Sequence, residues 1–255
     1  MQFLHKTINS LRWTKDRITQ SSKFGARVVG CFDYLRYLPL GYNQRWALNG
    51  QAQRQYIFSE LMELFRFSAL IETGTHIGTT ALYLHKKSGL PVYTVENDQR
   101  RGMHAKVKLL RFRKIHVFLE ESKSFLKKLI KILPTINNQL FFYLDAHWDD
   151  KMPIKEELQI IFGNWKNSIV MVDDFAVPGD TGYGYQEWSD GKTLCLEYLK
   201  DIITEFNLAI FFPLAGSISE TGHKRGCVVL AKNKDIIEIL QNSKNLKSHK
   251  CDTLN

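Results

Sequence analysis

The sequence predicts an α/β fold with a doubly wound sheet of seven strands, mostly parallel and with an antiparallel last strand. From Ser68 onward, short apolar runs alternate with helical ones, which implies a sheet covered by helices on both faces. The last two apolar runs are joined by residues 215–226, a stretch too short and too rich in Gly and Ser for a crossover helix. These two strands are therefore expected to pair antiparallel.

The expected elements follow one another in a regular order. The strands span residues 69–73, 92–96, 115–119, 140–145, 169–173, 209–213 and 227–231, and the helices between them span 79–87, 99–110, 122–133, 154–162 and 192–206. An amphipathic helix over 51–67 precedes the first strand, with Tyr56, Leu61, Leu64 and Phe65 on its apolar side. The chain divides into a helical N-terminal extension (1–50), a main domain (51–240) and a polar, lysine-rich tail (241–255) that is expected to fray.

The composition is that of a folded protein, with 44% hydrophobic and 12% aromatic residues in 255. A net charge of +9 permits a polyanionic partner without requiring one. No apolar run is long enough to span a membrane, and the N-terminus lacks the apolar core of a secretory signal, so a cytoplasmic protein is predicted. The first 20 residues have the spacing of a basic amphipathic helix, expected to pack on the domain, with membrane or partner contact as the alternative. The extension as a whole is expected to cover the substrate side or an oligomer interface.

A glycine-containing turn between the first strand and its helix is the main functional signal. The run SALIETGTHIG places Glu72, Gly74 and Gly78 as E-x-G-x-x-x-G, and such a turn lets backbone N–H groups approach a ligand. It resembles the first motif of class I S-adenosylmethionine (SAM)-dependent methyltransferases, which has a further central glycine where this chain has His76. The resemblance implies a Rossmann-like methyltransferase fold over the main domain, with SAM contacted by Glu72, Gly74, Thr75, His76 and Gly78. A purely structural turn is the alternative.

Acidic residues follow the next two strands. Glu96 lies about twenty residues after the glycine turn, where an acid can bind both ribose hydroxyls, and the resemblance assigns it that role. The same resemblance places Glu121 and Ser122 near the adenine. The alternatives are a solvated acid for Glu96 and a helix N-cap for Ser122.

Three carboxylates end the fourth and fifth strands, at Asp145, Asp173 and Asp174. Because the carboxyl ends of parallel strands meet at one edge of a sheet, we expect these side chains to converge. Clustered carboxylates repel one another unless a cation or a proton relieves them, and oxygen ligands suit Mg²⁺. A divalent ion there would bind a substrate hydroxyl and lower its pKa.

This constellation resembles the metal-dependent O-methyltransferases of the macrocin/novobiocin type, which methylate sugar hydroxyls. The resemblance implies that Asp145, Asp173 and Asp174 bind the metal, and that the general base lies just after Asp145. His147 stands there, and an imidazole suits proton abstraction near neutral pH. The alternatives are a loop cap for Asp145, a hinge and a surface acid for the Asp pair, and packing for His147. Asp149 and Asp150 lie close enough to replace a ligand.

The acceptor side is predicted from two loops. Tyr183, Tyr185 and Trp188 follow the fifth strand and are expected to offer flat faces to a sugar or aromatic acceptor. His223, Lys224 and Arg225 lie at the mouth of the last hairpin, either against an anionic part of the substrate or as a solvated turn.

The predicted function is a SAM-dependent O-methyltransferase that methylates a hydroxyl of a small molecule, sugar or glycan with the help of a divalent metal, Mg²⁺ by preference. One alternative is an RNA-binding protein or RNA methyltransferase, supported by seven basic residues in 100–114. The other is an inactive accessory protein with a SAM-binding fold, which the non-glycine residue His76 supports.

Overall fold

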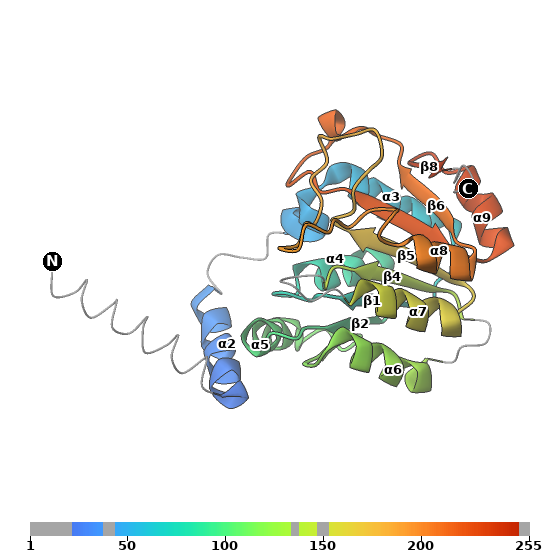
Figure 1. The fold of residues 1–255 in the computed structure, drawn as a ribbon. Coiled ribbons are helices and arrows are strands. Elements are labelled where there is room, and N and C mark those ends of the chain that lie inside the picture. Colours follow the sequence, from blue (N-terminus) through green and yellow to red (C-terminus); the bar gives the residue numbers. More distant parts are fainter. Residues whose placement is uncertain (1–21, 38–43, 134–137, 147–152, 250–255) are drawn as a thin grey trace, which may run out of the picture.

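The computed structural model describes residues 22–37, 44–133, 138–146 and 153–249. Its centre is an eight-stranded sheet with the order β3-β2-β1-β4-β5-β7-β6-β8 (Figure 1). The strands are β1 (Ala69–Thr73), β2 (Val92–Val95), β3 (Ile115–Phe118), β4 (Leu140–Leu144), β5 (Ser168–Asp173), β6 (Ala209–Pro213), β7 (Cys227–Ala231) and β8 (Leu246–His249). The first five are parallel, whereas β7 is antiparallel to both β5 and β6.

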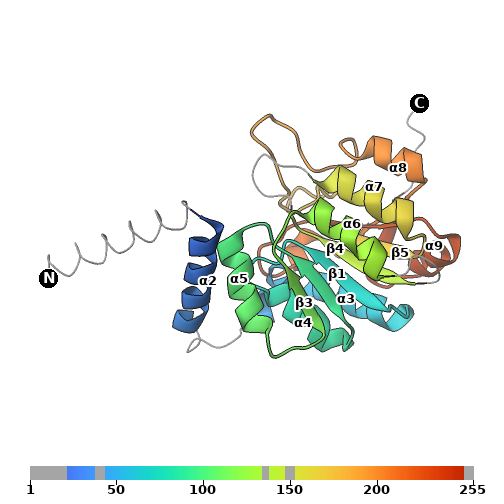
Figure 2. The same cartoon turned by 90° about the horizontal axis from the view of Figure 1, so that it is seen from below.

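Helices cover both faces of this sheet, as the alternating pattern predicts. The described helices are α2 (Lys23–Tyr37), α3 (Ala52–Leu64), α4 (Thr79–Ser88), α5 (Gln99–Leu109), α6 (Ser122–Ile132), α7 (Ile154–Asn164), α8 (Lys200–Phe206) and α9 (Lys234–Gln241), with short 3₁₀ segments η2 (Gln44–Gly50) and η3 (Ser217–Ser219). One core cluster packs α6, α7 and α8 on the sheet, and a second packs α3, α4, α5 and α9 on the opposite face (Figure 2). The sheet residues of β1, β4 and β5 are buried throughout.

The predicted count of seven strands is wrong, because residues 246–249 form the eighth strand. These residues fall in the segment predicted to be a fraying tail. β8 pairs antiparallel with β6, from Pro213 opposite Leu246 to Ile210 opposite His249. Leu246 is buried, and the Glu60 carboxylate of α3 accepts hydrogen bonds from the backbone N–H groups of Lys244 and Asn245. Contacts with β6 and with Glu60, both distant in sequence, therefore order residues 244–249, although their polar composition predicted a fraying tail.

Two helices differ from their predicted form. The helix expected over 192–206 begins only at Lys200, because the backbone before it is tied to the loop after β5, with Leu194 accepting from Ala176 N–H and donating to Gln186. In α3, Tyr56 and Leu64 are exposed, whereas Ile57, Phe58 and Leu61 are buried. Leu61 and Phe65 are buried as predicted, and the prediction is wrong for Tyr56 and Leu64.

The N-terminal extension is helical where it is described. α2 packs against α5, and η2 leads into α3. The amphipathic helix predicted for the first 20 residues lies outside the described residues. Among the helices that the structure describes, none combines the length and the apolar character that crossing a bilayer requires.

Candidate functional site

The turn after β1 has left-handed backbone at three alternating positions. Gly74, His76 and Gly78 have φ values of +90°, +50° and +74°. A Cβ on Gly74 would lie 2.1 Å from the carbonyl oxygen of Asp145, so only glycine fits there. His76 stands where the methyltransferase motif has its central glycine, and it keeps the conformation that glycine adopts readily. The turn therefore has the backbone geometry of a glycine-rich loop despite the substitution.

Glu72 is fully buried beneath this turn. The Thr94 hydroxyl of β2 donates to its Oε2, and the Thr75 hydroxyl lies 2.5 Å from that of Thr94. The other carboxylate oxygen, Oε1, has no hydrogen-bond partner among the described residues. Burial raises the pKa of Glu72 to about 8, with a smaller contribution in the same direction from Glu96. One oxygen of this buried carboxyl group, close in sequence to the glycine turn, therefore has no hydrogen-bond partner among the described residues.

Glu96 follows β2 and fastens the turn to the second strand. Its Oε2 accepts the backbone N–H of His76 at 2.7 Å, and its Oε1 accepts that of Asp98 at 2.9 Å. Partial burial raises the pKa of Glu96. Gly102 of α5 lets the helix approach, since a Cβ there would lie 2.4 Å from Leu119 Cδ2 and 3.1 Å from Glu96 Cβ. Glu96, which is predicted to bind the ribose hydroxyls, therefore lies next to the turn that is predicted to bind SAM.

The residues predicted to lie near the adenine point in different directions. Glu121, and not Ser122, occupies the N-cap position of α6, and its side chain makes no capping hydrogen bond. Ser122 is buried and lies beside Glu157 of α7, whose pKa burial raises to about 7 while the Ser122 and Thr73 hydroxyls lower it. The N-cap alternative for Ser122 is therefore wrong.

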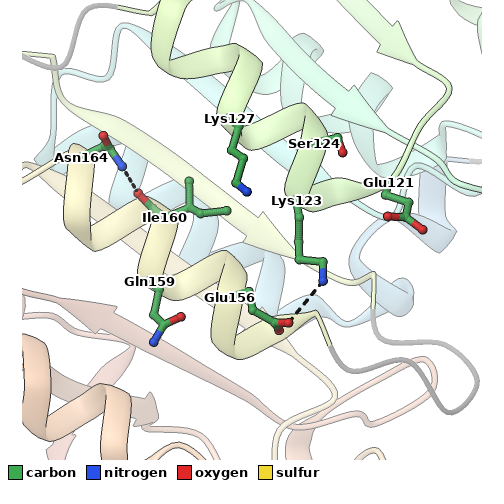
Figure 3. A pocket seen from close by; sticks show the side chains of 8 residues that line it. All are labelled: Glu121, Lys123, Ser124, Lys127, Glu156, Gln159, Ile160 and Asn164. Atoms are coloured by element: carbon green, nitrogen blue, oxygen red, sulfur yellow. Dashed lines mark hydrogen bonds and ion pairs between the residues drawn. The ribbon is translucent and has the colours of Figure 1, made fainter.

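A groove of about 560 Å³ lies between α6 and α7 (Figure 3). Across it Lys123 of α6 pairs with Glu156 of α7 at 3.2 Å. Within α7, Asn164 Nδ2 donates to the carbonyl of Ile160 at 2.7 Å. Its lining residues are Glu121, Lys123, Ser124, Lys127, Glu156, Gln159, Ile160 and Asn164. Glu121, predicted to lie near the adenine, lines this groove, whereas none of the glycine-turn residues and none of the three aspartates does.

The three aspartates at the ends of β4 and β5 do lie near one another. The pKa of Asp145 is well above its usual range, because of its burial first and then the nearby carboxylates of Asp173 and Asp174. Asp173 is itself completely buried, and Asp174 follows it with a left-handed φ of +54°. The predicted convergence of acids at this edge of the sheet is confirmed.

Asp173 is surrounded by donors of this chain. It accepts hydrogen bonds from the guanidinium of Arg54, the phenol of Tyr143, Asn49 Nδ2 at 2.9 Å and the backbone N–H of Asp174 at 2.7 Å. Arg54 also donates to the carbonyl of Gly226 at 3.0 Å, which places the cation between α3 and the start of β7. The carboxylate is therefore neutralised by an internal arginine.

Asp174 has a cation of its own. Arg225 Nε lies 2.7 Å from Asp174 Oδ1, and the pair is partly exposed. The residues that the structure describes include no group of three or more His, Cys, Asp or Glu arranged to hold a metal ion. A divalent ion on Asp173 and Asp174 would have to displace these arginines, so this donor set does not fit the predicted metal site. His147, Asp149 and Asp150 lie outside the described residues.

Residues before the first strand help to build this cluster, and the sequence analysis missed them. Gln51 exchanges two hydrogen bonds with the backbone of Arg225, at 2.8 and 3.0 Å. The Glu220 carboxylate accepts the backbone N–H of Gln53 at 3.0 Å and so caps the start of α3 from another part of the chain. Arg54 had a detectable signal, since it stands three, four and seven residues before Ile57, Phe58 and Leu61, on their helix face.

Two of the three aromatic residues predicted to contact the acceptor are part of the core instead. Tyr183 and Trp188 are buried, and the Tyr183 hydroxyl donates to the carbonyl of Ala215 at 3.0 Å. Tyr185 is exposed. In the hairpin, Arg225 pairs with Asp174 and is no solvated turn residue, whereas His223 packs against the ring of Trp46 with centroids 5.5 Å apart.

Comparison with solved structures identifies the fold. The O-methyltransferase TomG from Streptomyces achromogenes, involved in tomaymycin synthesis and solved with SAM, has a TM-score of 0.52 at 14% identity, over 71% of this chain and 80% of TomG. A putative O-methyltransferase from Klebsiella pneumoniae has a TM-score of 0.51 at 14% identity, over 71% of this chain and 80% of that chain. An O-methyltransferase from Bacillus cereus in complex with S-adenosylhomocysteine (SAH) has a TM-score of 0.50 at 15% identity, over 71% of this chain and 81% of that chain.

No protein-family model and no curated protein matches the sequence. The structural likeness shows that the chain has the Rossmann-like fold of these methyltransferases, as predicted from the alternating strands and helices. The finer resemblance to the macrocin/novobiocin type stays a prediction.

Proposed function

We propose that this protein is a SAM-dependent methyltransferase that transfers a methyl group to a hydroxyl of a small molecule or sugar. The observation that carries the proposal is the turn after β1, where positions 74, 76 and 78 are all left-handed above the buried Glu72. The fold supports it, because TomG was solved with SAM and the Bacillus cereus protein with SAH.

The residues of the turn have distinct roles in this proposal. Glu96 accepts the ribose hydroxyls with the lone pairs that its two backbone hydrogen bonds leave, and Glu72 supports the turn from the interior through the hydroxyls of Thr94 and Thr75. Thr75 and Gly78 shape the loop, and Glu121 contacts the adenine, whereas Ser122 is buried beside Glu157. SAM supplies an electrophilic methyl group when bound.

Asp145 is placed to act on the acceptor. Its backbone N–H donates to the carbonyl of Thr73 at 2.9 Å, and its carbonyl approaches Gly74, so the side chain emerges beside the SAM turn. If SAM were bound here, it would supply the methyl group to the acceptor hydroxyl and leave as SAH, and a base of this chain would take the hydroxyl proton. His147 is the predicted base, because an imidazole accepts a proton near neutral pH.

The metal-assisted form of this function has less support than the form without a metal. Arg54 and Arg225 supply the positive charge that a divalent ion on Asp173 and Asp174 would supply. We therefore propose transfer in which no step depends on a metal. Methyl transfer that is unchanged in EDTA would agree with this proposal, and activity restored only by added Mg²⁺ would favour the predicted metal site.

The decisive experiment is a calorimetric titration of the full chain with SAM and with SAH. We expect both to bind in the micromolar range, and Glu96→Ala to weaken binding by about tenfold or more, as the loss of hydrogen bonds to a charged group does. Glu156→Ala, which removes a surface acid of the groove between α6 and α7, is the control and should bind SAM normally. An absence of binding by wild type would overturn the proposal and favour the inactive accessory protein. Tight, salt-dependent RNA binding together with SAM binding would favour RNA as the acceptor.

A further inference from the structure

Helix α2 lies outside the sheet and is attached to the molecule through α5 (Figures 1 and 2). The contact is close, because a Cβ on Gly30 would lie 2.3 Å from the carbonyl oxygen of Arg100. Polar bonds fix it, with Arg100 Nε 2.6 Å from Asp33 Oδ2 and Arg27 Nε donating to Gln99 at 2.9 Å. One face of α2 is therefore firmly packed and its orientation is set.

A different face of the same helix carries four exposed apolar side chains, which we name the α2 stripe. Phe24, Val28, Phe32 and Leu35 are 77%, 38%, 65% and 54% exposed. Their spacing of four, four and three residues places them in one line along a helix. Single exposed apolar residues are ordinary on protein surfaces, but an aligned set with two phenylalanines marks an interaction surface.

Basic residues predominate in α2 and in the helix on which it packs. Among the described residues of α2 there are three basic residues, Lys23, Arg27 and Arg36, and one acid, Asp33. Residues 99–114, which include α5, contain seven Lys or Arg and no acid. Lys23 and Arg36 of α2 and Arg101 and Lys106 of α5 are exposed. The apolar line therefore lies in a strongly basic region.

Exposed apolar residues next to basic residues favour one kind of partner over the others that could bind an apolar stripe. A second copy of the chain would bring the same basic region against itself in a two-fold contact, and like charges would repel. An RNA would satisfy the charge but would leave Val28 and Leu35 without an apolar partner. An anionic bilayer satisfies both, since its phosphates attract Lys and Arg while the acyl boundary takes up phenyl and aliphatic groups.

We propose that α2 binds the surface of membranes that contain anionic phospholipids, with the α2 stripe inserted into the boundary between headgroups and acyl chains. The basic residues of α2 and α5 contact the phosphates. Binding of this kind is peripheral and reversible, and it fails in high salt because charges near the surface are screened. The proposal is independent of the cofactor and of the acceptor.

Vesicle flotation with the full chain tests this. We expect binding to vesicles of phosphatidylcholine with phosphatidylglycerol, little binding to phosphatidylcholine alone, and loss of binding in 0.5 M NaCl. Phe24→Ser combined with Phe32→Ser should weaken binding by about tenfold or more, because two buried phenyl groups are lost. Ile218→Ser is the matched control, since Ile218 is 94% exposed on η3 and should not matter.

Three results would overturn the proposal. The first is an absence of binding to anionic vesicles. The second is binding that the double variant leaves intact while its circular dichroism stays that of the wild type. The third is a stable dimer by light scattering that the double variant dissociates, which would assign the α2 stripe to a second copy instead.

Discussion

The predicted site has two halves, one after β1 and β2 and the other after β4 and β5, and the buried acids of these halves differ in their hydrogen bonding. At the β1–β2 side, the buried carboxyl group of Glu72 keeps one oxygen without a hydrogen-bond partner among the described residues. At the β4–β5 side, Asp173 is saturated by Arg54, Tyr143 and Asn49. Both halves end buried strands with acids, so the residue pattern alone does not distinguish a site open to a ligand from one closed by the protein itself. The distinction comes from which side chains other segments deliver.

The largest expected effect is on the closed half. Arg54→Met leaves Asp173 buried without its cation, and breaking a buried pair in this way costs about 3–5 kcal/mol of unfolding free energy. Urea denaturation measures the loss. Arg225→Met is the matched control. Arg225 is 29% exposed although Asp174 is only 9% exposed, so solvent screens this pair more than it screens the Arg54–Asp173 pair, and the loss should be smaller. Equal losses for the two variants would contradict the contrast between a fully buried and a partly exposed pair.

A double variant sharpens the same test. Arg54→Met with Asp173→Asn removes both charges, so much of the stability lost in Arg54→Met should return. If the double variant is as unstable as Arg54→Met alone, the hydrogen bonds of Arg54 to the carbonyls near β7, and not its charge, are what the fold requires.

The sequence was informative where a function depends on neighbouring residues. The turn at 74–78 and Glu96 are local features, and their predicted proximity agrees with the bond between Glu96 and the backbone of His76. Arg54 and Asp173 are 119 residues apart and meet only because α3 lies next to the start of β7, which no local pattern encodes. The same reason explains the missed β8, because its pairing with β6 is a tertiary contact.

The contribution of Glu72 to the free energy of unfolding should depend on pH. The pKa of Glu72 is raised from 4.5 to about 8 by burial, so the folded state binds a proton that the unfolded state has released between these values. Wild-type stability from this group therefore falls as the pH rises through that window. Glu72→Gln, which stays neutral, should gain up to a few kcal/mol over wild type between pH 5 and pH 8, measured by urea denaturation.

Glu60 provides a control, because its pKa shift is opposite in sign to that of Glu72. Hydrogen bonds from Ser243, Lys244 and Asn245 lower its pKa despite partial burial, so its contribution is present at neutral pH and lost in acid. Glu60→Gln should therefore lose stability at pH 7 and lose less as the pH falls. A Glu72→Gln variant with the same pH trend as Glu60→Gln would mean that Glu72 is charged in the folded protein, as a carboxylate with an unseen partner would be.

The smallest expected effect concerns the one residue at which this turn departs from the methyltransferase motif. A left-handed backbone costs a residue with a Cβ about 1 kcal/mol, so His76→Gly should stabilise the protein by up to about that amount, and SAM affinity measured by calorimetry should be kept. Gly74→Ala is the control in the same loop, because its Cβ would collide with the carbonyl of Asp145 and binding should be lost. If His76→Gly weakens SAM binding instead, the imidazole contacts the cofactor. The histidine at the position of the central glycine would then contribute to binding and would not merely be tolerated there.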